Sequence, residues 1–494
     1  MGQEINWYAL LDVCYDANDE EIRSAYHLSA RKYHPDTNPN LGTSDLFYRV
    51  QKAYDALSSS SRREEYNKTL GDEDLSTPGF SKRTFVSKSK ITPSEDSQLV
   101  YVLLDIGAKP ASKTSIQRPL NLSLVLDRSK SMNGERMDMV KDNSIRLLRQ
   151  LGPNDIISIV TFSDRAEILV PPTQIADIHL IESRISRIVT SGSTEIYQGL
   201  SAGIAQIRQN RIPGYINHLI LFTDGRTYGD EDLCLELGKE AAEEGISISG
   251  LGIGSEWNDE FIDDLASCAG GVSMYITGPK DLKKFLDQKY KNLEQIYGEQ
   301  LTLDFTNSPE CILQYAFRIY PEPAPLLHTV PVRAGNLHMT NKLVLMLEFC
   351  INPMDNQQKE ITLMDGYVTL HIPTRKVPKT RLPISIKCTI TKDVDTNQGM
   401  PAPIVHALSQ LTLYRMQEKA QEELKKGDTV KASRHLQYLA THLLSKGERE
   451  LAHTVLKEAE NIKQQNNFTQ EGDKRIKYGT RSLLLPPGPE KKQI

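Results

Sequence analysis

The chain lacks most of the features that would place a 494-residue protein in a specialised class. Its six cysteines are scattered without a CxxC pair, which argues against a zinc ribbon or a dense disulfide framework and favours a reducing compartment. Nowhere do about 18 apolar residues run together, and the opening MGQEINWYAL has no basic region followed by a long apolar stretch. We therefore predict a soluble, cytoplasmic protein with no membrane segment.

The charge balance argues against a dedicated nucleic-acid binder. The formal net charge is −5, and no run of basic residues is interleaved with aromatics. A hydrophobic content of 39% is too high for a largely disordered chain, and the length suits roughly three or four packed domains. The sequence predicts a multidomain globular protein without a nucleic-acid partner.

The usual signatures of enzymes are also missing. The sequence has no P-loop pattern GxxxxGK[ST], and its eleven histidines are dispersed and form no convincing Ser-His-Asp or Cys-His set. We expect no intrinsic enzyme activity.

The first 70 residues predict two helices joined by a turn. Asn18 is placed to cap the first helix and Glu21 to complete a capping box. Pro35 disfavours the helical conformation in the residue before it, so we expect this helix to end at His34. An isolated His-Pro-Asp tripeptide is best interpreted as a helix stop. The first helix presents Ile22, Ala25, Ser29 and Tyr33 on one face, and the second presents Leu46, Phe47, Val50, Tyr54 and Leu57.

The sequence around this turn favours a functional interpretation. WYALLDVCYDANDEEIRSAYHLSARKYHPDTNP, followed by FYRVQKAYDALSSSSRREEY, closely resembles the J domain of the DnaJ family. The resemblance implies a co-chaperone that docks on a DnaK-type chaperone of the seventy-kilodalton heat-shock family and stimulates its ATP hydrolysis. A basic helix face would steer toward an acidic patch, and proline would fix the residues beside it. By this resemblance the chaperone-binding residues are His34, Pro35, Asp36, Arg23, Tyr26, Arg31 and Lys32.

One part of the first helix departs from the DnaJ pattern. The family usually has two basic residues after the tyrosine and then a buried leucine, whereas this chain reads Tyr26-His27-Leu28-Ser29. We expect Leu28 to be exposed, Ser29 to face the core, and docking on the chaperone to be weakened.

Residues 71–96 predict a flexible linker, because they are rich in Ser, Thr and Lys and poor in apolar periodicity. Neither a Gly/Phe-rich segment nor CxxCxGxG repeats follow, as they do in many DnaJ proteins. We therefore expect the selection of clients to lie further along the chain.

Short apolar runs alternate with helical patterns between residues 119 and 290. The runs LNLSLVL, IISIVTF, HLILFT and ISISGLGI predict a doubly wound α/β domain, in which ligands bind at the carboxyl ends of the strands. Two strands end in polar clusters, LVLDRSKSM and LFTDG, and TSGSTEIYQG adds a third loop. Carboxylates with hydroxyls suit Mg²⁺, although each loop alone fits ordinary helix capping equally well.

Together the three loops resemble the von Willebrand factor type A (VWA) domain. The metal-ion-dependent adhesion site (MIDAS) of that family reads DxSxS, then Thr, then Asp. The resemblance implies Mg²⁺, or another divalent ion such as Mn²⁺ or Ca²⁺, and an unidentified protein ligand whose carboxylate often completes the coordination. Lys130 stands where the family usually has glycine, and we expect its side chain to point into water. The predicted metal residues are Asp127, Ser129, Ser131, Thr194 and Asp224.

An aspartate at the end of a buried strand is also how haloacid-dehalogenase-like phosphatases present their nucleophile. Those enzymes need a second carboxylate two residues later as general acid. Here that position is Ser129, so a metal-dependent phosphatase is the weakest of the alternatives.

The flanking segments show strand-like alternation before and after the α/β domain, and helical periodicity returns from residue 401. We predict a β-sandwich into which the α/β domain is inserted, with its first strand near 99–106, and then a three-helix unit whose apolar stripe packs on the sandwich. Gly427 and Gly447 predict left-handed helix caps. The tripeptide 483–485 either docks on a sheet edge of its own chain or binds a partner.

The sequence thus predicts a multidomain co-chaperone adaptor: an all-α J domain, an α/β doubly wound VWA domain inserted in a β-sandwich, and a C-terminal helical bundle. The J domain would stimulate a DnaK-type chaperone, and the VWA domain would bind a client or complex. The alternative is a VWA interaction scaffold without productive chaperone coupling. The expected boundaries are 4–70 for the J domain, 71–96 for the linker, 97–118 and 298–395 for the sandwich, 119–290 for the VWA domain, 401–465 for the helical domain and 466–494 for the tail.

Overall fold

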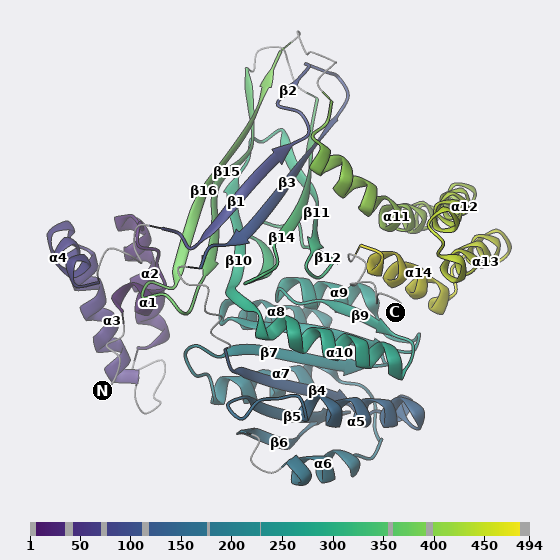
Figure 1. The fold of residues 1–494 in the computed structure, drawn as a ribbon, viewed down its shortest axis with the longest axis horizontal. Coiled ribbons are helices and arrows are strands. Elements are labelled where there is room, and N and C mark those ends of the chain that lie inside the picture. Colours follow the sequence, from purple (N-terminus) through teal and green to yellow (C-terminus); the bar gives the residue numbers. More distant parts are fainter. Residues whose placement is uncertain are drawn as a thin grey trace, which may run out of the picture.

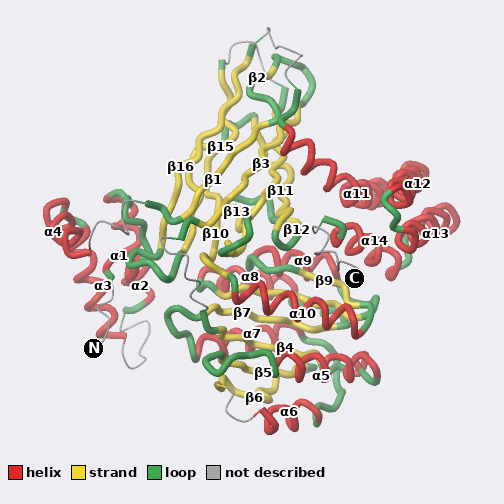
Figure 2. The backbone as a smooth tube through the Cα atoms, in the orientation of Figure 1, coloured by secondary structure: helices red, strands yellow, loops and turns green. Residues whose placement is uncertain are grey.

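The fold is described from a computed structural model, which has a central strand-rich body with helices at both flanks (Figures 1 and 2). The N-terminal helices lie on one side of an upright β-sandwich, the C-terminal helices on the other, and a separate α/β domain below. The structure describes residues 6–34, 43–70, 77–110, 118–174, 178–227, 229–353, 359–391 and 399–484.

The N-terminal domain is helical, as the sequence predicts. Asn18 Oδ1 accepts from the backbone N of Glu21 at 2.9 Å, and Glu21 Oε2 accepts from the backbone N of Asn18 at 2.8 Å, which confirms the capping box. The helix ends at Lys32 with Tyr33 as its cap, two residues earlier than predicted. The elements are α1 (Trp7–Leu11), α2 (Asp19–Lys32), α3 (Thr43–Leu57) and α4 (Ser60–Leu70).

The β-sandwich consists of two five-stranded sheets that enclose one apolar core. Strand β3, from before the α/β domain, pairs along its length with β14, from after it, which confirms the predicted insertion. One sheet has the order β1-β3-β14-β11-β12 and the other β13-β10-β15-β16-β2. The strands are β1 (Phe80–Val86), β2 (Lys90–Ile91), β3 (Gln98–Ala108), β10 (Ile296–Thr306), β11 (Cys311–Tyr320), β12 (Ala324–Pro325), β13 (Val332–His338), β14 (Leu343–Ile351), β15 (Glu360–His371) and β16 (Lys379–Ile390).

The predicted linker 71–96 is wrong over much of its length. Strand β1 pairs with β3 from Phe80↔Ala108 to Val86↔Val102, and β2 pairs with β16. The polar sequence has a physical reason, since β1 is an edge strand in which only Phe80 is buried. Residues 71–76 lie outside the described part of the chain.

The α/β domain has a six-stranded sheet in the order β6-β5-β4-β7-β8-β9, parallel except for β6. Strands β4, β5 and β7 are buried at every residue, as their apolar runs predict. Helices α5, α6 and α10 pack on one face and α7, α8 and α9 on the other. The bounds are β4 (Leu120–Asp127), α5 (Glu135–Leu148), β5 (Ile156–Phe162), β6 (Ala166–Gln174), α6 (Ile178–Ser186), α7 (Ile196–Gln209), β7 (Ile216–Thr223), α8 (Glu231–Glu243), β8 (Ile246–Ile253), α9 (Asp259–Cys268), β9 (Ser273–Ile276) and α10 (Pro279–Glu294).

The C-terminal domain has one helix more than predicted. Helix α14 occupies much of the segment expected to be a tail, and its sequence hides this because Lys474, Lys477 and Arg481 are buried against acidic residues of the α/β domain. Gly427 and Gly447 are left-handed, with φ of 84° and 85°, as predicted. The helices are α11 (Ala402–Lys425), α12 (Thr429–Ser445), α13 (Arg449–Gln465) and α14 (Gln470–Ser482).

The apolar stripe of α11 packs on the sandwich, as predicted. Ile404 and Tyr414 share a buried cluster with Leu103 and Phe317 of the sandwich, and Leu484 joins them at 2% exposure. This part of the terminal leucine tripeptide therefore docks on its own chain, whereas Leu485 lies outside the described residues.

Every helix in the part of the chain that the structure describes is too short or too polar to traverse a lipid bilayer.

Candidate functional site

The predicted metal residues converge at the carboxyl ends of two adjacent parallel strands. Asp127 ends β4 and Asp224 follows β7, which lies beside β4 in the sheet. Because parallel strands end at the same edge, the loops after them meet there. The structure therefore brings these two loops together at one edge of the sheet.

Asp127 is held in place by hydrogen bonds from two neighbouring residues. The backbone N of Ser129 donates to Asp127 Oδ1 at 2.8 Å, and Thr223 Oγ1 donates to Asp127 Oδ2 at 2.8 Å. Burial raises the pKa of Asp127 to about 6, and the hydrogen bonds from Ser129 and Thr223 oppose that rise. Thr223 is a supporting residue that the sequence motif does not name.

The hydroxyl groups link the two aspartates into one network. Ser129 Oγ lies 3.0 Å from Ser131 Oγ, and Ser131 Oγ donates to Asp224 Oδ1 at 2.7 Å. Thr194 lies against the loop that carries Asp224. Its Oγ1 is 2.8 Å from the position that a Cβ would take on Gly225, the residue after Asp224. All five predicted residues thus lie in one cluster, and only Ser131 is exposed.

The cluster suits a hard divalent cation by its donor chemistry. It offers two buried carboxylates and three hydroxyls, all oxygen donors, and Mg²⁺ commonly binds through one or two carboxylates while it keeps several waters. Across the described ranges, no three His, Cys, Asp or Glu side chains gather as a metal site. A cation here would therefore rely on hydroxyls, water and a partner's oxygen to complete its shell.

One arginine in the cluster was missed by sequence reasoning. Arg136, in the first turn of α5, forms an ion pair with Asp224 Oδ2, and the same Nη1 donates to the Ser131 carbonyl oxygen at 3.3 Å. Nothing in the spacing of the sequence points to it, because it lies outside the DxSxS motif.

The predicted chaperone-binding face is largely solvent-exposed. Arg23, Arg31 and Lys32 are exposed on α2, Tyr26 stacks on Tyr54 with ring centroids 4.3 Å apart, and the ring of His34 packs edge-on against Phe47. Pro35 and Asp36 lie outside the described residues, so the structure places five of the seven predicted residues.

The exposure of Leu28 in the unusual stretch of α2 is as predicted, and weaker docking on a chaperone stays a prediction. Leu28 is 73% exposed, and Ser29 is half-buried. An apolar side chain therefore stands in water on the same helix as the basic residues.

The N-terminal domain docks on the sandwich through another face. Val377, in the loop between β15 and β16, is 3% exposed and packs in the core of the N-terminal domain. Arg381 pairs with Asp16 at 2.9 Å and with Glu21 at 2.7 Å, and Lys379 pairs with Asp12 at 2.9 Å. The docked face therefore contributes acidic and apolar side chains.

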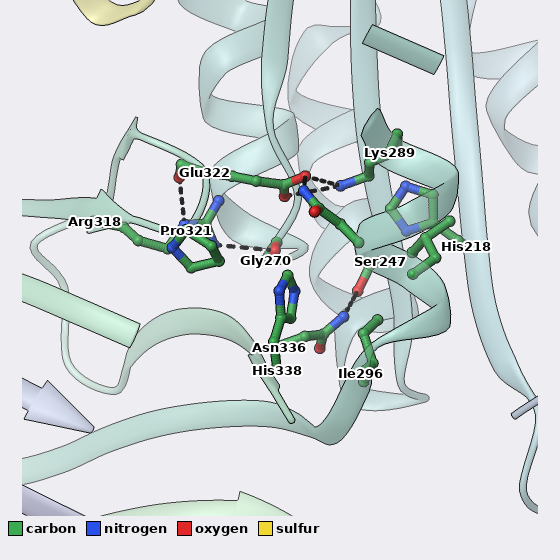
Figure 3. Close-up of a pocket in the computed structure, with 12 residues that line it drawn as sticks. His218, Ser247, Gly270, Lys289, Ile296, Arg318, Pro321, Glu322, Asn336 and His338 are labelled. Atoms are coloured by element: carbon green, nitrogen blue, oxygen red, sulfur yellow. Dashed lines mark hydrogen bonds and ion pairs between the residues drawn. The ribbon is translucent and has the colours of Figure 1, made fainter. Parts of the chain in front are cut away.

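A buried polar pocket lies where the α/β domain meets the sandwich (Figure 3). Lys289 Nζ donates to Glu322 at 3.0 Å, and Arg318 Nη2 donates to the Gly271 carbonyl oxygen at 2.7 Å. Burial alone would raise the pKa of Glu322, but Lys289 and Arg318 lower it to about 2. A volume of about 20 Å³ has room for one water, and the contacts of these residues join the two modules.

Comparisons with known proteins identify three regions of the chain. Residues 6–67 match the DnaJ domain, residues 121–288 the von Willebrand factor type A domain, and residues 402–486 the Sll0103-like C-terminal alpha-helical domain.

Among curated proteins, the uncharacterized protein sll0103 of Synechocystis is 29% identical over 383 residues, which are 75% of this chain and 89% of that one. The chaperone protein DnaJ of Trichormus variabilis is 40% identical over 74 residues, which are 15% of this chain and 19% of that one. The chain spans half or less of several other relatives, such as the uncharacterized protein YfbK of Escherichia coli, at 24% identity over 56% of this chain and 50% of that one.

Two solved structures share the fold over 83% of this chain. A von Willebrand factor type A protein from Catenulispora acidiphila matches with a TM-score of 0.62 at 14% identity, over 98% of its chain. The ArnB paralog VWA2 from Sulfolobus acidocaldarius matches with a TM-score of 0.51 at 16% identity, over its whole chain. The chain therefore combines a DnaJ domain, a VWA domain and an Sll0103-like helical domain in one polypeptide.

Proposed function

We propose that this chain is a cytoplasmic co-chaperone adaptor. Its J domain recruits a DnaK-type chaperone and stimulates ATP hydrolysis, and its VWA domain binds a protein client or complex with Mg²⁺, or Mn²⁺ or Ca²⁺, at the MIDAS-like cluster. The proposal assigns no enzyme activity to the chain itself, and no nucleic-acid or membrane partner.

The observation that carries this proposal is the orientation of the docked J domain. Asp12, Asp16 and Glu21 face the sandwich, whereas Arg23 and Arg31 remain solvent-exposed. Exposed basic side chains on α2 are accessible to an acidic surface of a chaperone. Because the J domain is docked, the chaperone would be held at a defined place relative to the VWA domain.

The donor set of the VWA cluster supports the second half of the proposal. If a cation binds, Ser129, Ser131 and Thr194 would offer hydroxyls, and Asp127 and Asp224 would offer negative charge directly or through water. The ion would supply a Lewis-acidic position for an oxygen of the bound protein. Ser129 stands where a phosphatase would need its general acid, so the cluster favours binding over phosphate-ester chemistry.

The first test is single-turnover ATP hydrolysis by a DnaK-type chaperone in the presence of the full-length chain. We expect stimulation by the wild type, loss of it in His34→Gln, and full stimulation by Lys68→Gln, a control at an exposed position of α4. If neither the wild type nor the control stimulates, the alternative of a VWA scaffold without chaperone coupling replaces this proposal.

The second test addresses the remaining alternative. Mg²⁺-dependent hydrolysis of p-nitrophenyl phosphate that disappears in Asp127→Asn would make the chain a phosphatase. We expect no turnover in either protein.

A further inference from the structure

Arg136 occupies a position that simple helix physics does not favour. It lies in the first turn of α5, directly after the capping Gly134 and Glu135, where the partial positive charge of the helix N-terminus repels a cation. Its side chain nevertheless turns toward the loops of the VWA cluster. Some local interaction must outweigh the helix dipole.

The compensating partner is Asp224, whose side chain is fully buried. Asp224 Oδ1 accepts from Ser131 Oγ at 2.7 Å, and Asp224 Oδ2 pairs with Nη1 of Arg136. A buried carboxylate without a neutralising charge is costly, so the guanidinium provides what a metal ion would otherwise provide.

The guanidinium of Arg136 lies against Gly254 in the loop after β8. A Cβ on Gly254 would lie 2.9 Å from Nη2 of Arg136, so a side chain there would push the guanidinium aside. Gly254 has a φ of 74°, in the left-handed region that favours glycine. The Arg136 side chain is 37% exposed, which leaves it a path into solvent.

We propose that Arg136 is a built-in counter-cation that competes with a divalent ion for Asp224. Without the ion, the guanidinium neutralises Asp224 and closes the cluster. When the ion binds, repulsion between the two cations drives Arg136 outward, away from Gly254. The inference rests on the proposed metal binding and adds to it a residue that sets the affinity of the site.

The alternative is that Arg136 only fastens two loops together. A purely structural arginine would lower stability equally with and without the metal when it is removed, and it would leave metal affinity unchanged or weaken it. A competing arginine would raise metal affinity on removal and lower stability only when the ion is absent.

The test is titration of Mn²⁺ into the full-length, EDTA-stripped protein, with the free ion followed by electron paramagnetic resonance. We expect Arg136→Gln to bind Mn²⁺ about five- to tenfold more tightly than the wild type, a size typical of a part-exposed charge. Arg136→Lys keeps the charge and should bind within about twofold of the wild type. Arg226→Gln is the matched control, because this exposed arginine in the same region donates to the Glu256 carbonyl oxygen at 3.0 Å and does not contact Asp224.

Thermal unfolding gives a second readout on the same proteins. Ion-free Arg136→Gln should melt below the wild type, and saturating Mn²⁺ should remove most of that difference. Equal affinities in Arg136→Gln and the wild type would overturn the role of Arg136 and leave metal binding intact. If neither protein binds Mn²⁺, both the role of Arg136 and the proposed metal binding are overturned. Asp224→Asn serves as the reference protein without Mn²⁺ binding.

Discussion

The two ends of the chain attach to the same central body in different ways. Besides the buried contact of Val377, the J domain is held by ion pairs whose acidic partners are well exposed, with side-chain exposures of 71% for Asp12, 59% for Asp16 and 39% for Glu21. Helix α14 is held by charges that are almost completely buried, at 7% for Asp263 and 5% for Arg481. Exposed pairs contribute little and are screened by salt, whereas a buried pair cannot lose one partner cheaply.

The buried contact is a network rather than a single pair. Asp263 accepts from Arg481 Nη2 at 2.8 Å, pairs with Lys477 at 2.8 Å, and accepts from the hydroxyl of Tyr478 at 3.1 Å. Burial alone would raise the pKa of Asp263, but Arg481 and Lys477 lower it well below its usual range. The contrast teaches that α14 is an integral part of the VWA body, while the J domain is a module clamped to its side.

The largest expected effect is at Asp263. Asp263→Asn leaves the buried Arg481 without its countercharge and leaves Lys477 with Asp259 alone, so we expect the free energy of unfolding to fall by about 3–5 kcal/mol in urea denaturation. Glu260→Gln is the control, because its pair with Lys425 is about 70% exposed on both sides and should contribute less than about 1 kcal/mol. Similar losses in both variants would remove the distinction between buried and exposed attachment.

A smaller effect concerns pH at the contact between α11 and the sandwich. Burial raises the pKa of Glu418 to about 7, and a hydrogen bond from the hydroxyl of Tyr315 at 3.2 Å opposes the rise. The unfolded chain, in which this carboxyl has its ordinary pKa of 4.5, releases the proton at a lower pH than the folded protein does. The stability that this group contributes therefore falls as pH rises from about 4.5 to 7.

Glu418→Gln should remove this pH dependence. At pH 8 we expect the variant to be more stable than the wild type by about 3 kcal/mol, and the difference should vanish near pH 4. Urea midpoints at four pH values between 4 and 8 measure it. A constant difference across that range would mean that Glu418 does not titrate in this window.

The smallest expected effect on the body comes from releasing the J domain. Arg381→Ala removes the pairs with Asp16 and Glu21, and we expect docking to weaken by about 1 kcal/mol while the unfolding midpoint of the body stays unchanged. Hydrogen exchange around Asp16 should be faster in the variant than in the wild type. In 1 M salt, exchange should also accelerate in the wild type, because salt screens the ion pairs. Lys387→Ala, on the same strand with an exposed pair to Glu360, is the control and should leave exchange there unaltered.

The sequence predicts the elements that follow a simple period and misses those whose burial depends on charge. The apolar runs of β4, β5 and β7, the capping box of α2 and the residues of the MIDAS-like cluster are all where the patterns indicate. Helix α14 is missed because its buried face carries Lys477 and Arg481, whose partners lie more than 200 residues away.

The other misses have the same origin in distant partners. Strand β1 looks like a linker because an edge strand keeps its polar side chains. Val377 gives no local sign that it completes the core of the J domain, and Arg136 gives none that it pairs with Asp224. Local periodicity reports only a residue's own element, so contacts between modules appear only in the folded chain.

The insertion of the VWA domain also separates in time the synthesis of two neighbouring strands of the sandwich. Strand β3 ends at Ala108, and its neighbour β14 begins at Leu343, about 235 residues later. At roughly 5–20 residues per second, a ribosome needs on the order of ten to fifty seconds to deliver the missing strand. During that interval one edge of β3 has no neighbour to pair with, and the helices of the J domain have already been made.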